Sequence, residues 1–160
     1  MTNAEFREVL EDRTAKYAVE GFKYLRELPY DVSTKVIAHQ LGKSASSIGA
    51  NYPEANRSES RDDFVHKVAI AVKEANESCY WFKVLRGLYC SNERIEALAK
   101  ETCELRNLLQ SILKSARSRK LPHSQLPHSQ LLHSQLHEIR IDELNGKTRF
   151  FGVQINTHEH

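Results

Sequence analysis

Apolar residues recur at intervals of three and four along four segments of about 25 residues each, and this helical periodicity constrains the fold more than any other feature. The segments cover approximately residues 4–28, 32–56, 61–88 and 92–120. Charged residues occupy most of the other positions, as in helices that bury one face. Because short turns join the segments, neighbouring helices must run antiparallel. We therefore predict an all-α protein, in which residues 1–120 form an antiparallel up-and-down four-helix bundle.

Helix boundaries are indicated by proline and by short polar side chains. Pro29 ends the first helix near Leu28, because proline disfavours the helical conformation of the residue before it. Side chains that accept a hydrogen bond from a free amide of the first turn are expected to cap the later helices. The candidates are Asp31 or Ser33 for the second helix, Ser60 for the third, and Ser91 or Asn92 for the fourth.

The third segment has an unusually wide apolar sector. Beyond its main stripe it carries Val65, Ile70, Trp81 and Leu88. A helix of this kind is either central to the bundle or also contacts a second subunit. Both possibilities remain open from the sequence.

The second segment contains a run of small residues, 44–50, followed by Asn51, Pro53 and Glu54. Small side chains allow another helix to approach closely, and Pro53 predicts a kink, with the helix continuing to about Asn56. Asn51 and Glu54 can face the same side of the helix and could form a site. We favour a structural role, in which they satisfy backbone groups freed by Pro53 and pair with Arg57 or Arg61.

Residues 121–160 differ in character from the bundle. Leu-Pro-His-Ser-Gln occurs twice, followed by Leu-Leu-His-Ser-Gln, and this five-residue period suits neither a helix nor a strand. We predict a low-complexity, flexible tail that arose by tandem duplication. His133 and His137 have the spacing of a metal site, but Ser134 stands where a metalloprotease helix has glutamate, so no catalytic metal is expected.

The composition favours a cytoplasmic protein. No apolar run is long enough to span a membrane, and the N-terminal residues lack the apolar stretch of a signal peptide. Cys79 and Cys90 would lie roughly 16 Å apart along one helix, which excludes a disulfide between them. These two residues and Cys103 are all expected to be buried, reduced thiols.

No catalytic constellation is apparent. The chain has only six glycines, no G-x-S-x-G turn and no phosphate-cradling loop. His39 and His66 are most simply explained as solvated helix-surface residues. We therefore expect neither enzymatic activity nor a cofactor.

A basic cluster ends the fourth segment and consists of Lys114, Arg117, Arg119 and Lys120. Cations at this position stabilise a helix by complementing its dipole. The same cations could bind the phosphates of RNA or DNA without reading sequence. Arg57 and Arg61, near the kink, are further candidates for nucleic-acid binding. The net charge of +2 does not decide between these alternatives.

The segment 44–55, with Asn51 and Glu54, and the following Ser-Arg-x-Asp-Phe at 60–64 resemble the bacterial family of 23S ribosomal RNA intervening-sequence proteins. The resemblance covers residues 3–118 and implies a four-helix bundle. A related branch contains the accessory variability protein of diversity-generating retroelements, a ring-like pentamer that associates with a reverse transcriptase and nucleic acid. This chain departs from the family pattern at Ala55, where glycine is common, and the family shows no counterpart of the tail.

The resemblance implies a homo-oligomer, with a pentamer as the expected state. One hypothesis is a non-catalytic scaffold that binds RNA, DNA or a nucleic-acid enzyme such as a reverse transcriptase. The alternative is a protein-interaction module whose wide third helix serves only assembly.

Overall fold

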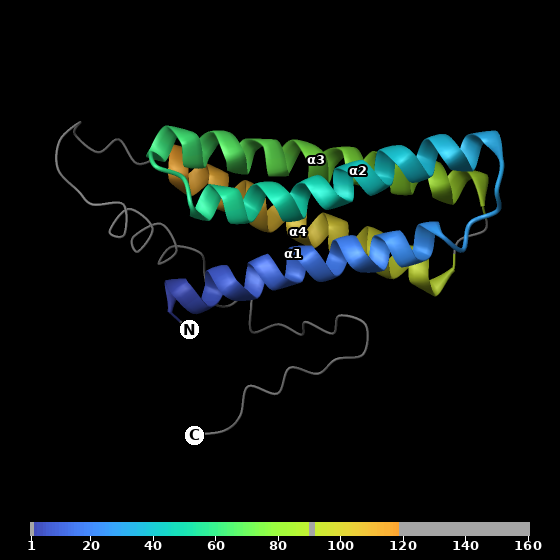
Figure 1. Ribbon diagram of the computed structural model, residues 1–160, viewed down its shortest axis with the longest axis horizontal. Coiled ribbons are helices and arrows are strands. Elements are labelled where there is room, and N and C mark those ends of the chain that lie inside the picture. The colour runs from blue at the N-terminus through green and yellow to red at the C-terminus, as the bar shows by residue number, and fades with distance from the viewer. Residues whose placement is uncertain (1, 90–91, 119–160) are drawn as a thin grey trace, which may run out of the picture.

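The computed structural model describes residues 2–89 and 92–118, and these residues form an all-α, antiparallel four-helix bundle (Figure 1). The prediction of the fold class is confirmed. The helices follow one another up and down, so that each turn reverses the chain. They are α1 (Asn3–Leu25), α2 (Val32–Asn56), α3 (Arg61–Leu88) and α4 (Glu93–Ser118). The predicted tail, 121–160, lies outside the described residues.

The N-caps of the last three helices are side chains that the sequence indicated. Oxygens of Asp31, Ser60 and Asn92 accept hydrogen bonds from backbone amides three residues ahead, at 2.8, 3.1 and 2.9 Å. Each cap satisfies an amide that has no partner within the helix. The amide and hydroxyl of Thr34 also lower the pKa of Asp31, because they donate to its ionised form.

The first helix ends earlier than predicted. We expected it to reach Leu28, but α1 ends at Leu25. The amide of Glu27 bonds to the carbonyl of Tyr24, three residues back, so the chain tightens into a turn before Pro29. The restriction that proline places on its neighbour therefore acts over the whole last turn.

The core is continuous and uses all four helices. The predicted stripe positions supply most of it, and the largest fully buried side chains include two tyrosines. Burial of these side chains from water is the main stabilising contribution. They are Tyr17, Tyr52, Phe82, Leu10, Leu41, Ile48, Leu85, Ile95, Leu98, Leu105, Leu109 and Val68.

Small residues let α1 and α2 approach closely, as predicted. A Cβ atom built on Gly49 would lie 3.3 Å from the carbonyl oxygen of Thr14, and one on Gly21 would lie 3.9 Å from Cβ of Ala45. The first of these distances is tighter than ordinary packing allows without movement of the α1 backbone. Gly49 therefore sets the separation of the two helices.

The wide apolar sector of α3 is largely satisfied within the bundle. This helix packs along both α2 and α4, and Val65 and Trp81 lie partly buried against the core. Leu88 and Tyr80 are more than half exposed. The central position of α3 accounts for most of its apolar residues without a second subunit.

Candidate nucleic-acid interface

The basic candidates gather at the end of the bundle where α2 and α4 finish and α3 begins, which is the left end in Figure 1. Lys114 and Arg117 are exposed on the last turns of α4. Arg119 and Lys120 lie outside the described residues. Arg57 is exposed at the end of α2, and Arg61 is half-buried at the start of α3.

Arg61 has an internal structural role. Its Nε and Nη2 atoms donate to the carbonyl oxygen of Ala116 at 3.0 and 2.6 Å, and Nη2 lies 3.4 Å from the carbonyl oxygen of Arg117. These carbonyls belong to the last turn of α4, where no helical amide remains to bond them. A cation here also complements the negative end of the helix dipole. Arg61 therefore fastens the start of α3 to the end of α4.

Arg57 is also engaged. Its Nη1 donates to the carbonyl oxygen of Pro53 at 2.8 Å, and its Nη2 lies 3.4 Å from Oε2 of Glu11 on α1. Asn56 donates to the other oxygen of Glu11 at 2.9 Å. The side chain of Arg57 is still 70% exposed, so the guanidinium remains accessible to a partner.

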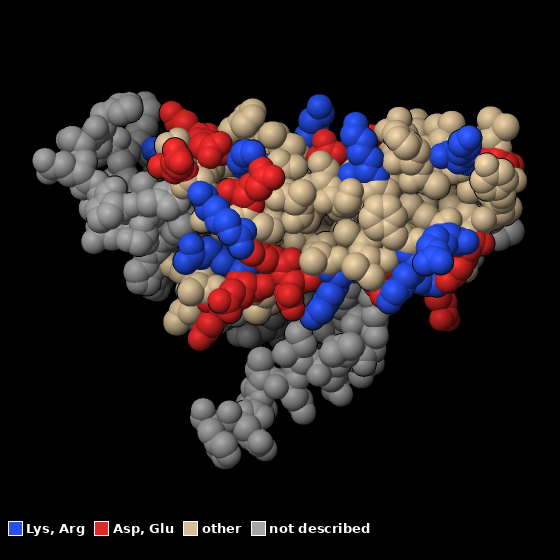
Figure 2. All heavy atoms as spheres, in the orientation of Figure 1, with Lys and Arg blue, Asp and Glu red and all other residues tan. Residues whose placement is uncertain are grey.

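Acidic residues interleave with the cations at this end. Glu59 and Asp62 are exposed in the α2–α3 turn and the first turn of α3. Figure 2 shows blue and red side chains alternating there on the visible face. The described surface is therefore of mixed sign, and a strongly positive field would require several copies of the chain or the basic residues that follow Ser118.

The Asn51–Pro53–Glu54 segment lies on α2, which continues through Pro53 to Asn56 as predicted. Asn51 donates to the carbonyl of Ser47 at 2.8 Å. The carboxylate of Glu54 pairs with Lys67 of α3 at 2.5 Å, and this raises the pKa of Lys67. The expected pairing of Glu54 with Arg57 or Arg61 was wrong. Lys67 stands opposite Glu54 on the antiparallel helix, whereas the two arginines turn to α1 and α4.

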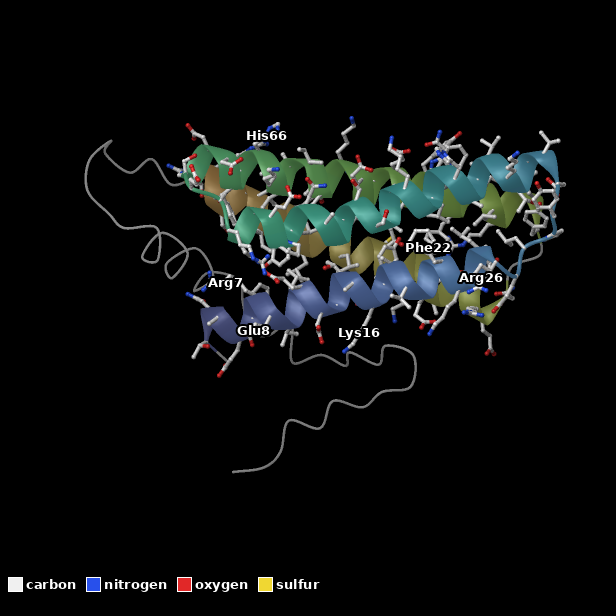
Figure 3. All side chains as sticks on the ribbon, viewed as in Figure 1. Arg7, Glu8, Lys16, Phe22, Arg26 and His66 are labelled. Carbon is white, nitrogen blue, oxygen red and sulfur yellow. The ribbon has the colours of Figure 1, made fainter. Side chains whose placement is uncertain are left out.

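The opposite end of the bundle exposes large apolar side chains. These residues, which we call the apolar end, occupy the last turns of α1 and α3, the α1–α2 turn and the first turns of α2. Phe22 lies between α1 and α2, against Gly42, and Figure 3 shows it there, with Arg26 beyond it. Uncharged surface predominates along this part of the visible face in Figure 2. The apolar end consists of Val19, Phe22, Tyr30, Val32, Val36 and Leu88.

Four buried hydroxyl groups, one from each helix, form a polar layer across the centre of the bundle. The Tyr17 and Thr102 hydroxyls are 2.7 Å apart, and those of Ser44 and Ser78 are 2.8 Å apart. Ser78 also interacts with the Tyr17 hydroxyl. Burial raises the pKa of Tyr17, although its two hydroxyl partners oppose the shift. The helical pattern had placed Tyr17 and Thr102 in the core but gave no indication that they meet.

A group of charges joins α1 to α4 beside this layer. Arg13 donates to both carboxylate oxygens of Glu101, at 2.6 and 2.8 Å, and to Glu104 at 2.6 Å. The side chain of Glu101 is only 3% exposed. Burial alone would lower the pKa of Arg13, but the two carboxylates outweigh it and raise the pKa. Arg94 extends the contact toward the apolar end by pairing with Glu20 and Glu27. We call these contacts, together with the Tyr17–Thr102 bond, the α1–α4 seam.

The cysteines differ from expectation. Cys103 is exposed and Cys79 is half-buried, so the prediction of buried thiols was wrong for Cys103 and only partly right for Cys79. The sulfur atoms of Cys79 and Cys103 lie 3.9 Å apart across α3 and α4. Cys79 follows Ser78, and Ser78 takes the fully buried position on that turn. Cys90 lies outside the described residues.

Features expected of an enzyme do not assemble in the part of the chain that the structure describes. His39 and His66 are exposed on α2 and α3, and Figure 3 shows His66 projecting from the bundle. Within residues 2–89 and 92–118, no three His, Cys, Asp or Glu side chains come together as metal ligands. The helices of these residues are also too short of apolar sequence to cross a membrane. An open depression beside the start of α4 contains the Arg86–Glu96 ion pair and has charges of both signs.

A protein-family model described as the 23S rRNA-intervening sequence protein matches residues 10–111, which is most of the bundle. The chain belongs to the 23S rRNA-intervening sequence protein family. The match begins in α1 and ends in α4, so the family's common element is the bundle itself. The resemblance seen in residues 44–64 is thereby confirmed.

A solved structure supports membership of the 23S rRNA-intervening sequence protein family. It is a protein of unknown function from the S23 ribosomal protein family of Bacteroides thetaiotaomicron, with 37% identity and a TM-score of 0.61. The similarity covers 68% of this chain and 97% of that one. None of the curated proteins compared with the chain matches it.

Proposed function

We propose that this 23S rRNA-intervening sequence protein is a non-catalytic, self-assembling scaffold that binds RNA or DNA, or a nucleic-acid enzyme such as a reverse transcriptase. The observation that carries the proposal is the division of the described surface between two ends. Apolar side chains are exposed at one end, while Arg57, Lys114 and Arg117 are exposed at the other. Such a molecule can associate through one end and present its cations at the other, in the cytoplasm where nucleic acid is accessible.

Self-association at the apolar end would bury side chains that otherwise face water. Tyr30 and Val32 are 90% and 84% exposed, and Phe22 and Val36 about half exposed. Exposed apolar groups gathered in one region mark interaction sites more often than scattered single residues do. A homopentamer would also place five copies of each cation in one particle, so that a nearly neutral chain presents a positive surface.

The assembly is tested by light scattering after size exclusion. A pentamer has a mass of about 92 kDa, five times the 18.4 kDa of one chain. Val32→Glu and Val36→Glu together should give a folded protein of lower mass. Val9→Glu is the matched control, because Val9 is 49% exposed on α1 near the opposite end. A wild-type monomer at micromolar concentration would contradict self-assembly.

Nucleic-acid binding is tested by titrating a structured RNA and a DNA duplex with the full chain at about 50 mM salt and above. Phosphate contacts release counterions, so affinity should fall steeply with salt and depend little on sequence. Glutamine at Lys114, Arg117, Arg119 and Lys120 should weaken binding and flatten the salt dependence by about one unit per lost contact.

The matched control removes four positive charges elsewhere. Glutamine at the exposed lysines 35, 43, 73 and 83, on α2 and α3, lowers the net charge equally. It should weaken binding less than the α4 variant does. Binding that is absent at low salt, or equally sensitive to both variants, would favour the alternative function, a protein-interaction module without a nucleic-acid role.

A further inference from the structure

Two cysteines that are 24 residues apart in sequence face each other across the α3–α4 contact. The Sγ atoms of Cys79 and Cys103 are 3.9 Å apart. Nearby pairs show that this is the natural register of the two antiparallel helices, because Arg86 and Glu96 stand opposite each other in the same way. A sulfur–sulfur bond is about 2.05 Å long, so bond formation needs the two sulfurs to approach by a little under 2 Å. Small rotations of two side chains can supply much of this movement.

The surroundings of the pair allow a reagent to reach it. Cys103 is exposed on α4, whereas Cys79 is half-buried on α3. Nη1 of Arg106 lies 3.8 Å from the sulfur of Cys79, where its positive charge favours a thiolate over a thiol. An exposed thiol with a second thiol beside it is the arrangement of cysteines that form disulfides on oxidation.

We propose that Cys79 and Cys103 form an oxidisable dithiol site, which takes a hydroperoxide as its oxidant and whose disulfide joins α3 to α4 at the polar layer. Cys79 directly follows Ser78 of that layer, and Cys103 directly follows Thr102. The bond would therefore close beside the hydroxyl groups that connect the four helices. It would fix the α3–α4 register at the centre of the bundle.

The reaction proceeds in two balanced steps. The Cys103 thiolate attacks the hydroperoxide, the O–O bond breaks, and a sulfenic acid forms with release of an alcohol, or of water from hydrogen peroxide. The Cys79 thiolate then attacks the sulfenic sulfur, the S–O bond breaks, and water leaves as the disulfide forms. Two thiols thus supply the two electrons that reduce the peroxide, and their protons end in the released alcohol and water. A dithiol reductant reverses the change by thiol–disulfide exchange.

Peptide mapping of the full chain provides a direct test. Cleavage after lysine and arginine places the three cysteines on separate peptides, residues 74–83, 87–94 and 101–106. Reduced protein is treated with a small excess of hydrogen peroxide, alkylated and digested without reductant. We expect 74–83 linked to 101–106, with Cys90 alkylated, two of the three thiols lost, and full reversal by dithiothreitol.

The physical consequence is measured by thermal melting of the same samples. Closing a loop of 25 residues should raise the melting temperature by roughly 5–15 °C. Cys90→Ser should retain the link and the shift, and Cys103→Ser should abolish both. Cys103 is exposed, so its replacement does not threaten folding. Links involving Cys90, links between chains, oxidation of Cys103 to a sulfinic acid without any link, or an unchanged melting temperature would each overturn the proposal.

Discussion

Replacing Tyr17 with phenylalanine removes a single hydroxyl group from the polar layer. The Thr102 hydroxyl donates to the carbonyl of Leu98 at 2.8 Å, so the Tyr17 hydroxyl must be the donor in its bond to Thr102. Both side chains are fully buried. The variant therefore loses one hydrogen bond and leaves one lone pair of Thr102 without its donor.

The expected cost follows from these contacts. A neutral hydrogen bond contributes about 1 kcal/mol, and an unsatisfied buried group adds to the loss, so Tyr17→Phe should lower the free energy of unfolding by about 1–2 kcal/mol. Thr102→Val should cost about 1–3 kcal/mol, because it leaves the Tyr17 donor without its Thr102 acceptor. The double variant replaces both groups and should cost at least about 0.5 kcal/mol less than the sum.

The assay is urea unfolding followed by circular dichroism at one protein concentration, since an assembly would make the transition concentration-dependent. Tyr80→Phe serves as the matched control, because Tyr80 is 57% exposed and its change should stay within about 0.5 kcal/mol. A Tyr17→Phe variant as stable as this control would refute the role of the hydroxyl. Strict additivity of the two single changes would show that Tyr17 and Thr102 do not interact.

Three further outcomes follow from the structure. Glu54→Ala should leave the urea midpoint nearly unchanged, because this exposed carboxylate makes a surface ion pair; a large loss would restore the structural role first expected of it. Gly87→Ala should raise the free energy of unfolding by about 0.5–1 kcal/mol, since no atom lies within 4 Å of the added methyl group. Stability should persist to about pH 9 and fall above it, because burial raises the pKa of Tyr17 and Tyr52 and brings that of Cys79 to about 11. In the alkaline range the unfolded chain loses these protons first, and a pH series of melts in which stability stayed constant to pH 11 would contradict this.

Features that depend on one helix at a time could be predicted from the sequence. Leu41, Ile48 and Leu105 are buried because a period of 3.6 residues puts them on one face, whatever that face meets. Asp31 and Ser60 cap their helices because a short polar side chain bonds amides three residues ahead. Both kinds of inference use spacing within a single segment.

Features that join two helices could not be predicted in the same way. The contacts Arg61–Ala116, Tyr17–Thr102 and Cys79–Cys103 depend on how far one helix is displaced along another. An amphipathic pattern fixes the rotation of a helix about its axis but leaves this displacement open. The error at Glu54 has the same origin, since its neighbour on α3 is set by register.

The α1–α4 seam has a consequence for how the native bundle opens. Along its length α1 packs closely on α2 but approaches α4 at fewer points, and Arg13, Tyr17 and Arg94 supply the polar links there. Ion pairs and hydroxyl bonds regain much of their energy from water when they separate, whereas apolar contacts do not. Partial unfolding should therefore begin with detachment of α1, leaving α2, α3 and α4 packed together. The amides of α1 would then exchange hydrogen through this partial opening, while those in the middle of α3 would wait for global unfolding.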